Sequence, residues 1–421
     1  MVSTALAIFG SLISINLAPA WRASQARELT VEQAVSRAIE TNPRLKAAIL
    51  EVKAAEFGVS SARALTNPTV TYTPGFTRAG SDEELLIAQP LEISGTRSAR
   101  AGVASAELKG ARAQATLELR ALVFETKAAY FDLVRLQERM LLVQELLKSS
   151  KELEGIAGRQ VELGSRAGIE LSQIRIESTR AKQQATLVEA EYKAKLAELN
   201  SLMGRDSGEP VKLSSIDTQF QTSSETESVT KALEARAELD LIKANQEKFK
   251  KEASLAKAEG LPDLTPHYRA ESISREPRAG GFGVGINLPI FDHGSRRNRV
   301  RQAEASAKAE EQKLLSTQNL IKQEVTQALA RLNAATEVVN DFKGGLLEES
   351  RKVLEASRKG FELGETSLVS LLEAQRTFRA VQTEYIDALA SQAQARISLE
   401  LATGSIPATL LPTLNSKDTS K

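Results

Sequence analysis

The residues from Thr96 to Leu163 contain no strong helix breaker, and this run constrains the fold more than any other feature of the sequence. A single helix over this run would be roughly 100 Å long, because an α-helix rises ~1.5 Å per residue. A helix of that length cannot lie within a compact domain and has to pack along its length against other helices. The sequence therefore predicts long helices that associate side by side.

The composition agrees with close helix packing and excludes several functions. Aromatic residues make up only 4% of the chain, and alanine supplies much of the apolar content, as from Ala101 to Ala115. The formal net charge is +1, so no global field attracts nucleic acid, and we expect no nucleic-acid partner. Cysteine is absent, which removes disulfides, thiolate metal sites and a lipidated N-terminal cysteine.

The chain also contains two copies of one unit, with ordered landmarks at nearly constant spacing. The offset between matching residues is about 200 near the ends of the copies and smaller near their beginnings. This change of offset predicts a five-residue insertion in or near the hairpin of the second copy. The matching segments are Glu162-Leu163-Gly164 with Glu362-Leu363-Gly364, Gln89 to Gly95 with Leu288 to Gly294, and Ala38-Ile39-Glu40 with Ala232-Leu233-Glu234.

Each copy is expected to contain a helix, two strands, a very long helix, a turn and a second long helix. In the first copy, we expect one helix from Thr30, a plausible N-cap, to about Leu65, where Thr66-Asn67-Pro68 stops it. We predict a first repeat over 27–210, a linker over 211–225, a second repeat over 226–405 and a polar tail over 406–421.

Residues of about 66–92 and 262–290 change from helical periodicity to alternation, which predicts four strands. The turn of the second pair is expected around Ser274 to Gly281. One apolar face and one small or polar face suits a strand between lipid and water, and equally an edge hairpin of a soluble sandwich. Four strands cannot enclose a lumen, so only an oligomer that pools its strands would form a pore. The candidate lipid-facing residues are Val70, Tyr72, Phe76, Phe282, Val284 and Ile286.

The amino terminus resembles a secretory signal peptide over residues 1–26. Thr4 to Leu17 are almost all apolar or small, and Ala18-Pro19-Ala20 offers a small-x-small site. No Lys or Arg precedes Arg22, which departs from the usual pattern and leaves a buried N-terminal helix as the alternative.

Three segments on this duplicated frame resemble the outer-membrane factors of the TolC family. Leu29 to Pro43 is similar to the opening helix of the family. Pro289 to Gly294, followed by two arginines, resembles its strand-to-helix junction, and Arg358 to Gln375 resembles its periplasmic turn. Gln89 to Arg97 is most similar to the heavy-metal efflux subgroup typified by CzcC and CusC. The junction residues carried by these motifs are Pro90, Gly95, Pro289, Asp292 and Gly294.

The resemblance implies a mainly α fold with a small β part, in a homotrimer with a twelve-stranded outer-membrane β-barrel continued by a periplasmic α-helical barrel. It implies an outer-membrane location, contact with outer-membrane lipid, and two partners: a periplasmic adaptor and an inner-membrane pump. The implied function is a passive exit duct, in this subgroup for heavy-metal cations. A multidrug efflux channel and a type I secretion channel remain the alternative functions. A periplasmic helical adaptor is a weaker alternative, since adaptors usually carry one hairpin and not duplicated strand pairs.

The same resemblance places the periplasmic tips at about 158–169 and 358–369. Gly164 and Gly364 are the expected left-handed residues that let the chain reverse, and Leu163 and Leu363 precede them. The family's narrowest acidic rings would fall on Glu170 and Gln173 in the first copy, and on Ser370 and Glu373 in the second. The alternative is that the two glutamates are ordinary solvated side chains.

No cofactor, metal site or catalytic activity is expected. The two histidines, His267 and His293, make no ligand cluster, and no hydrolase, zinc-protease or phosphate-loop motif occurs. Four arginines open the second long helix, where they would meet lipid headgroups or, more simply, form a solvated face paired with carboxylates of the chain. They are Arg296, Arg297, Arg299 and Arg301.

Overall fold

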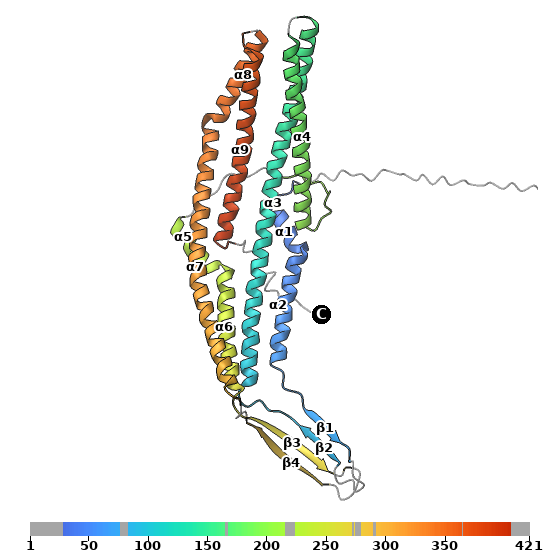
Figure 1. Cartoon of the computed structure of the whole chain (residues 1–421), viewed down its shortest axis with the longest axis vertical. Coiled ribbons are helices and arrows are strands. Elements are labelled where there is room, and N and C mark those ends of the chain that lie inside the picture. Colours follow the sequence, from blue (N-terminus) through green and yellow to red (C-terminus); the bar gives the residue numbers. More distant parts are fainter. Residues whose placement is uncertain are drawn as a thin grey trace, which may run out of the picture.

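The computed structural model describes residues 28–75, 83–164, 167–214, 224–271, 273, 279–288, 292–363 and 365–405. The expected signal peptide, the polar tail and most of the expected linker lie outside these residues. The described chain is an elongated helical body with one small sheet at its end (Figure 1). The expected mainly α class with a small β part is confirmed, and the two copies follow each other in the same element order.

The first copy consists of α1 (Val31–Thr41), α2 (Pro43–Ala62), β1 (Thr69–Thr73), β2 (Glu84–Ala88), α3 (Thr96–Glu162) and α4 (Gly168–Leu202). The second copy consists of α5 (Glu225–Ala235), α6 (Ala237–Ala258), β3 (Asp263–Glu271), β4 (Ala279–Asn287), α7 (Ser295–Asp341), the π-turn η1 (Phe342–Leu346), α8 (Leu347–Leu363) and α9 (Leu368–Ala402).

The expectation of a single first helix was wrong, because the chain breaks between α1 and α2. Thr30 does cap α1 through a capping box with Gln33. Asn42 then leaves the helical conformation, and its side chain accepts a hydrogen bond from the Arg44 amide at 2.9 Å. Proline at the first position of α2 has no N–H to lose there, so Asn42-Pro43 ends one helix and begins the next. The second helix also stops at Ala62, before the expected Leu65.

The long helix α3 has 67 residues, as its sequence predicts, but its counterpart in the second copy is interrupted. Both long helices follow a left-handed glycine, Gly95 at φ 82° and Gly294 at φ 81°. The second one bends between α7 and α8 (Figure 1), at the π-turn η1. Within this turn Gly345 leaves the helical conformation, with φ 149°. A π-turn accommodates one extra residue in a helix. The spacing between copies accordingly rises from 199 at Gly95 and Gly294 to 200 at the tips.

The four strands form one antiparallel sheet in the order β1-β2-β3-β4, so the central β2–β3 pair joins the two copies. The second hairpin, Asp263–Asn287, is five residues longer than the first, Thr69–Ala88, which accounts for the inserted residues. The turn expected at Ser274 to Gly281 was placed too wide, because Ala279–Gly281 already belong to β4. The first strand ends at Thr73, so Pro74 lies beyond it. Phe76, one of the candidate lipid-facing residues, lies outside the described residues.

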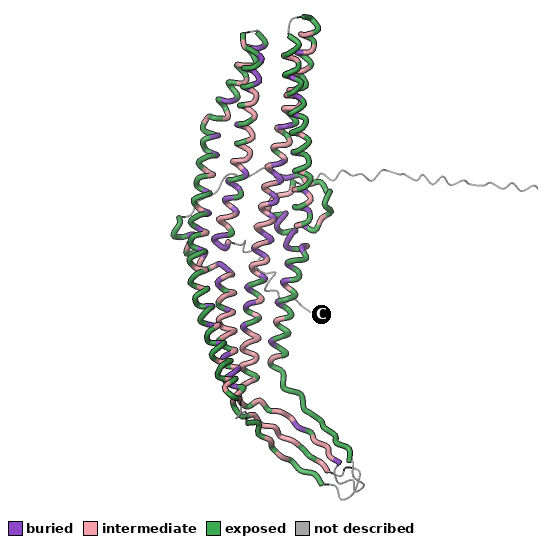
Figure 2. Tube along the Cα trace, in the orientation of Figure 1, coloured by how far each residue is buried: buried purple, intermediate pink, exposed green. Residues whose placement is uncertain are grey.

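The helix α3 is the central element of the helical body. It packs against α2 and α6 in the half near the sheet and against α4 and α9 in the other half. The largest buried side chains include Tyr130, Leu133 and Leu199, where α1, α3 and α4 meet. Buried residues follow α3, whereas α2, α4 and α7 are largely exposed along the two lateral edges (Figure 2). Within the described residues, no helix combines the length and apolar character needed to cross a membrane.

Candidate functional site

The tip of the first hairpin is built around Gly164, as its sequence predicts. Leu163 closes α3, and Gly164 follows at φ 71°, with its N–H donating to the Val161 carbonyl at 3.0 Å. A left-handed residue at this position satisfies a terminal carbonyl and reverses the chain. In the second hairpin α8 ends at Leu363 and Ser367 caps α9. Gly364 lies outside the described residues, so its conformation stays a prediction.

The two tips share one apolar cluster. It contains Ala157 and Ile174 from the first hairpin, and Phe361, Leu368, Leu371 and Leu372 from the second, with Leu171 packed against it. The cluster holds the ends of the two hairpins together. In contrast, Leu163 and Leu363 are 82% and 73% exposed, although both are large apolar residues. Each hairpin therefore ends with an exposed leucine.

The four candidate gate residues lie in the first turns of α4 and α9, next to this cluster. Glu170 is half-buried beside Leu171, while Gln173, Ser370 and Glu373 are exposed. Glu373 accepts a hydrogen bond from Arg376 at 2.9 Å. Arg376 is thus an ion-pair partner of Glu373 within α9.

Sequence analysis missed Glu177 and Arg376, which bridge the two hairpins. The Arg376 guanidinium on α9 donates to the Glu177 carboxylate on α4 at 2.5 Å. The spacing of Glu373 and Arg376 indicates a pair within one helix. Nothing in the sequence signals a contact between residues 199 positions apart.

The bridge keeps the Glu177 carboxyl ionised to a lower pH than an ordinary glutamate. Partial burial acts to raise its pKa, but the hydrogen bond and charge of Arg376 outweigh burial and hold the pKa below its ordinary value. The bridge therefore contributes above the ordinary glutamate pKa and is lost as the pH falls through the depressed pKa.

At the opposite end of the molecule, the sheet has two chemically different faces. Val70, Tyr72, Phe282, Val284 and Ile286 lie on one face and are 56–91% exposed. The other face carries mainly small or polar residues such as Thr69, Thr71, Thr265 and Arg269, with Leu86 as an apolar exception. Thr265 and Arg269 lie opposite glycines of β4. Arg269 pairs there with Glu84 and Glu271.

The histidines show no metal-binding arrangement in the structure. A Cβ atom at Gly283 would lie only 2.5 Å from Nε2 of His267, so this imidazole lies directly over the glycine of the neighbouring strand. His293 takes a left-handed conformation at φ 46° in the junction before α7. The described part of the chain contains no group of three His, Asp or Glu side chains that would hold a metal ion.

The strand-to-helix junctions are fixed by polar contacts. Asp292 accepts hydrogen bonds from the amides of Gly294 at 3.0 Å and Arg296 at 3.3 Å, and the first of these chiefly lowers the pKa of its carboxyl. In the first copy, Arg100 binds Glu92 through two hydrogen bonds of 2.7 and 3.1 Å. Pro90 follows Gln89, whose backbone N–H donates to the Pro266 carbonyl. Pro289 lies outside the described residues.

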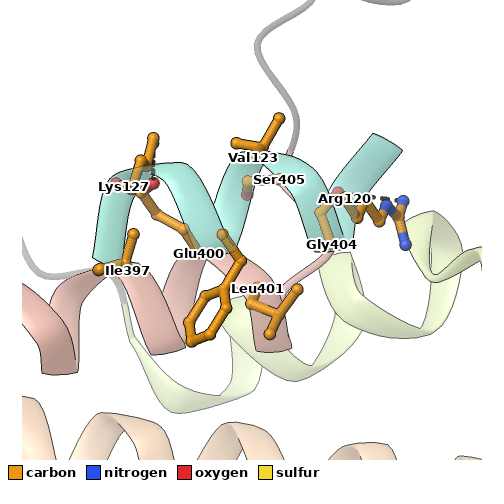
Figure 3. A pocket seen from close by; sticks show the side chains of 9 residues that line it. Arg120, Val123, Lys127, Ile397, Glu400, Leu401, Gly404 and Ser405 are labelled. Carbon is orange, nitrogen blue, oxygen red and sulfur yellow. Dashed lines mark hydrogen bonds and ion pairs between the residues drawn. The ribbon is translucent and has the colours of Figure 1, made fainter. Parts of the chain in front are cut away.

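A pocket lies near the middle of the molecule between α3 and the end of α9 (Figure 3). Its Lys127 and Glu400 form an ion pair. Arg120 donates to the carbonyls of Ala235 and Gly404, the latter at 3.2 Å, and so completes the ends of α5 and α9. Burial lowers the pKa of this guanidinium. Because these contacts link α3 to the ends of α5 and α9, we assign the pocket a role in joining the copies.

The family model described as outer membrane efflux protein matches residues 34–205 and 229–405, which is most of both copies. The cobalt-zinc-cadmium resistance protein CzcC of Cupriavidus metallidurans is 26% identical over 96% of each chain. The outer membrane protein TolC of Vibrio cholerae is 25% identical and covers 81% of this chain.

Solved structures show the same fold at lower identity. A CusC structure superposes with a TM-score of 0.75 at 15% identity and covers 90% of this chain and 93% of its own. The outer membrane protein VceC of Vibrio cholerae gives a TM-score of 0.74 at 16% identity, covering 89% and 96% of the two chains.

Proposed function

Since this chain belongs to the outer membrane efflux protein family, we propose that it forms a homotrimeric duct through which an inner-membrane pump and a periplasmic adaptor expel their cargo. The proposal is carried by the different character of the two ends of the molecule. One end is a sheet with an exposed apolar face, and the other is a pair of joined helical tips roughly 100 Å of helix away. No residue of the duct needs to perform chemistry.

The lateral edges of the chain support self-association. On α3, the small residues Ala106 and Gly110 are buried against α6. At the same positions of the second copy, 199 residues on, Ala305 and Ala309 of α7 are exposed. The opposite edge carries Phe57, which is 66% exposed on α2. Since α2 corresponds to α6, the α7 edge of one protomer would pack on the α2 edge of the next as α3 packs on α6.

The sheet supports the same assembly. Among the residues that the structure describes, its outer strands β1 and β4 each leave one edge unpaired. Pairing β4 of one protomer with β1 of the next would satisfy both edges and pool twelve strands around a lumen. The apolar face would meet outer-membrane lipid and the polar face would meet water.

The tips are proposed to dock the adaptor, through the exposed Leu163 and Leu363. We expect Gly164→Val to reduce pump-dependent export, because a β-branched residue at φ 71° is strained by about 1–3 kcal/mol and would distort the turn. Cross-linking of adaptor to channel and export in whole cells measure the effect. Gly155→Val is the control, since Gly155 lies inside α3 before the tip and has open space around it. Normal export by the Gly164 variant would contradict tip docking.

We propose further that Glu170 and Glu373 line the periplasmic aperture, with Gln173 and Ser370 beside them. Two charges about 8 Å apart in water repel by only roughly 0.5 kcal/mol, so the carboxylates would tune ion entry and not hold the gate. The shared apolar cluster and the Glu177–Arg376 bridge would set the closed state.

Glu170→Lys with Glu373→Lys is expected to lower cation preference in a planar bilayer and to weaken block by divalent cations, with the trimer intact. Glu191→Lys, far along α4, is the control. Unchanged reversal potentials and divalent block would remove these glutamates from the aperture.

For the cargo, we propose heavy-metal cations, on the basis of similarity to CzcC over nearly the whole of both chains. The similarity to TolC keeps multidrug efflux or protein secretion as the second candidate. Deleting the coding sequence should sensitise cells to cobalt, zinc or cadmium, and the full chain should restore resistance. Sensitivity to detergents or antibiotics alone would favour the second candidate. Absence of the protein from the outer-membrane fraction would contradict the duct itself.

A further inference from the structure

The two long helices begin with arginine on the membrane side of the molecule, against the preference of a helix N-terminus for acidic residues. Neither α3 nor α7 has an acidic residue in its first turn, whereas α5 and α6 each have two. Arg97 is the second residue of α3, and Arg297 and Arg301 lie in the first two turns of α7. The positive pole of each helix thus adds to these side-chain charges.

The acidic groups at the junctions are already engaged by other arginines. Glu92 binds Arg100, and Glu259 binds Arg299 at 2.6 Å. Asp292 accepts from two backbone amides and lies 3.9 Å from Arg296. This confirms intrachain partners for Arg296 and Arg299, but not for the remaining arginines.

At the two junctions, four arginines are exposed and form no ion pair within the described ranges. One of them, Arg63, comes from the end of α2 and not from a long helix. It lies at the junction because Arg100 of α3 donates to the carbonyls of Ala62 and Ala64 on either side of it. We call the set the junction arginines: Arg63, Arg97, Arg297 and Arg301.

Exposed apolar side chains border the junction arginines on the side of the sheet. Ile93, Leu261 and Leu288 are 61%, 53% and 54% exposed. Arg301, the seventh residue of α7, is only roughly 10 Å along that helix from its start. A headgroup layer is about 5–8 Å thick, and a long arginine side chain extends further toward it. The order of apolar border and then unpaired positive charge matches a membrane surface.

We propose that the junction arginines bind the phosphodiester headgroups of anionic phospholipid in the membrane leaflet nearest the helices. The proposal rests on the outer-membrane placement proposed above and names the lipid partner of that placement. Guanidinium groups suit this ligand because their planar donors bind phosphate oxygens in pairs. Each arginine near an anionic surface contributes about fivefold in binding.

The test titrates the full-length protein in nonionic detergent with fluorescent phosphatidylglycerol and, separately, with fluorescent phosphatidylcholine. We expect at least fivefold tighter binding of phosphatidylglycerol, and loss of that preference in R63Q/R97Q/R297Q/R301Q. The control R37Q/R159Q/R331Q/R351Q removes the same charge from four exposed arginines with no ion pair among the described residues, all distant from the junctions. It should retain the preference.

Two outcomes overturn the proposal: a junction variant that keeps the preference, or a control variant that loses it equally. The proposed outer-membrane location is tested separately, by a density gradient that separates inner from outer membranes. A junction variant that sediments with outer membranes as a trimer, yet binds both lipids alike, supports the lipid site. A wild-type protein absent from outer membranes contradicts the duct whatever its lipid preference.

Discussion

Ala309→Arg is expected to abolish the trimer while leaving the fold of the single chain intact. Ala309 is exposed in the chain, so an arginine there meets no intrachain neighbour that must move. At the matching position of α3, a Cβ on Gly110 would already lie 3.9 Å from side chains of three α6 residues. If α7 packs equally closely on the next protomer, the arginine has no space, and its charge is buried without a partner.

The expected loss is large because the effect recurs at every interface. Overpacking costs about 1–3 kcal/mol, and burying an unpaired charge costs several more. A closed trimer contains three such contacts. Light scattering in detergent should show monomers with the helical circular dichroism of the wild type. Ala309→Gly is the matched control, since glycine occupies this position in the first copy, and it should remain trimeric. A stable trimer of the arginine variant would exclude the α7 edge from the interface.

Val284→Arg is expected to prevent stable insertion into the outer membrane. Val284 is 64% exposed on the apolar face of β4, opposite Pro266. An arginine facing lipid near the bilayer midplane costs about 2–4 kcal/mol, and the trimer would carry three of them. The outer-membrane fraction should lose its detergent-resistant trimer, and unfolding from lipid vesicles should require less denaturant.

Thr71→Arg tests whether the face decides the result. Thr71 is also exposed on a strand of this sheet, but it lies on the opposite, polar face. We expect this variant to insert normally, because its arginine would meet water. Equal damage by both substitutions would show that strand composition, and not lipid exposure, determines insertion.

Local signals in the sequence predicted the elements that depend on neighbouring residues. Alternation located all four strands, and the glycine after Leu163 marked the end of α3. The break between α1 and α2 was also visible, since an asparagine before a proline is both a cap and a helix start. The helical periodicity continues on both sides of this pair, and for that reason it predicted a single helix across the break.

Contacts between distant segments could not be predicted in the same way. The Glu177–Arg376 bridge joins different hairpins, and its partners have ordinary helical spacing within their own segments. The π-turn at Phe342–Leu346 involves one extra residue, and low identity between the copies hides where it falls.

That extra residue determines how the two copies correspond in phase. In an uninterrupted helix, one inserted residue would turn every later side chain by about 100°. A π-turn accommodates one such residue, and the spacing between the copies is 199 at the junction glycines before it and 200 at the tips after it. Only the second hairpin contains such a turn, whereas α3 is continuous. In a trimer, straight and bent long helices would therefore alternate around the tube, and its rotational symmetry would be threefold and not sixfold.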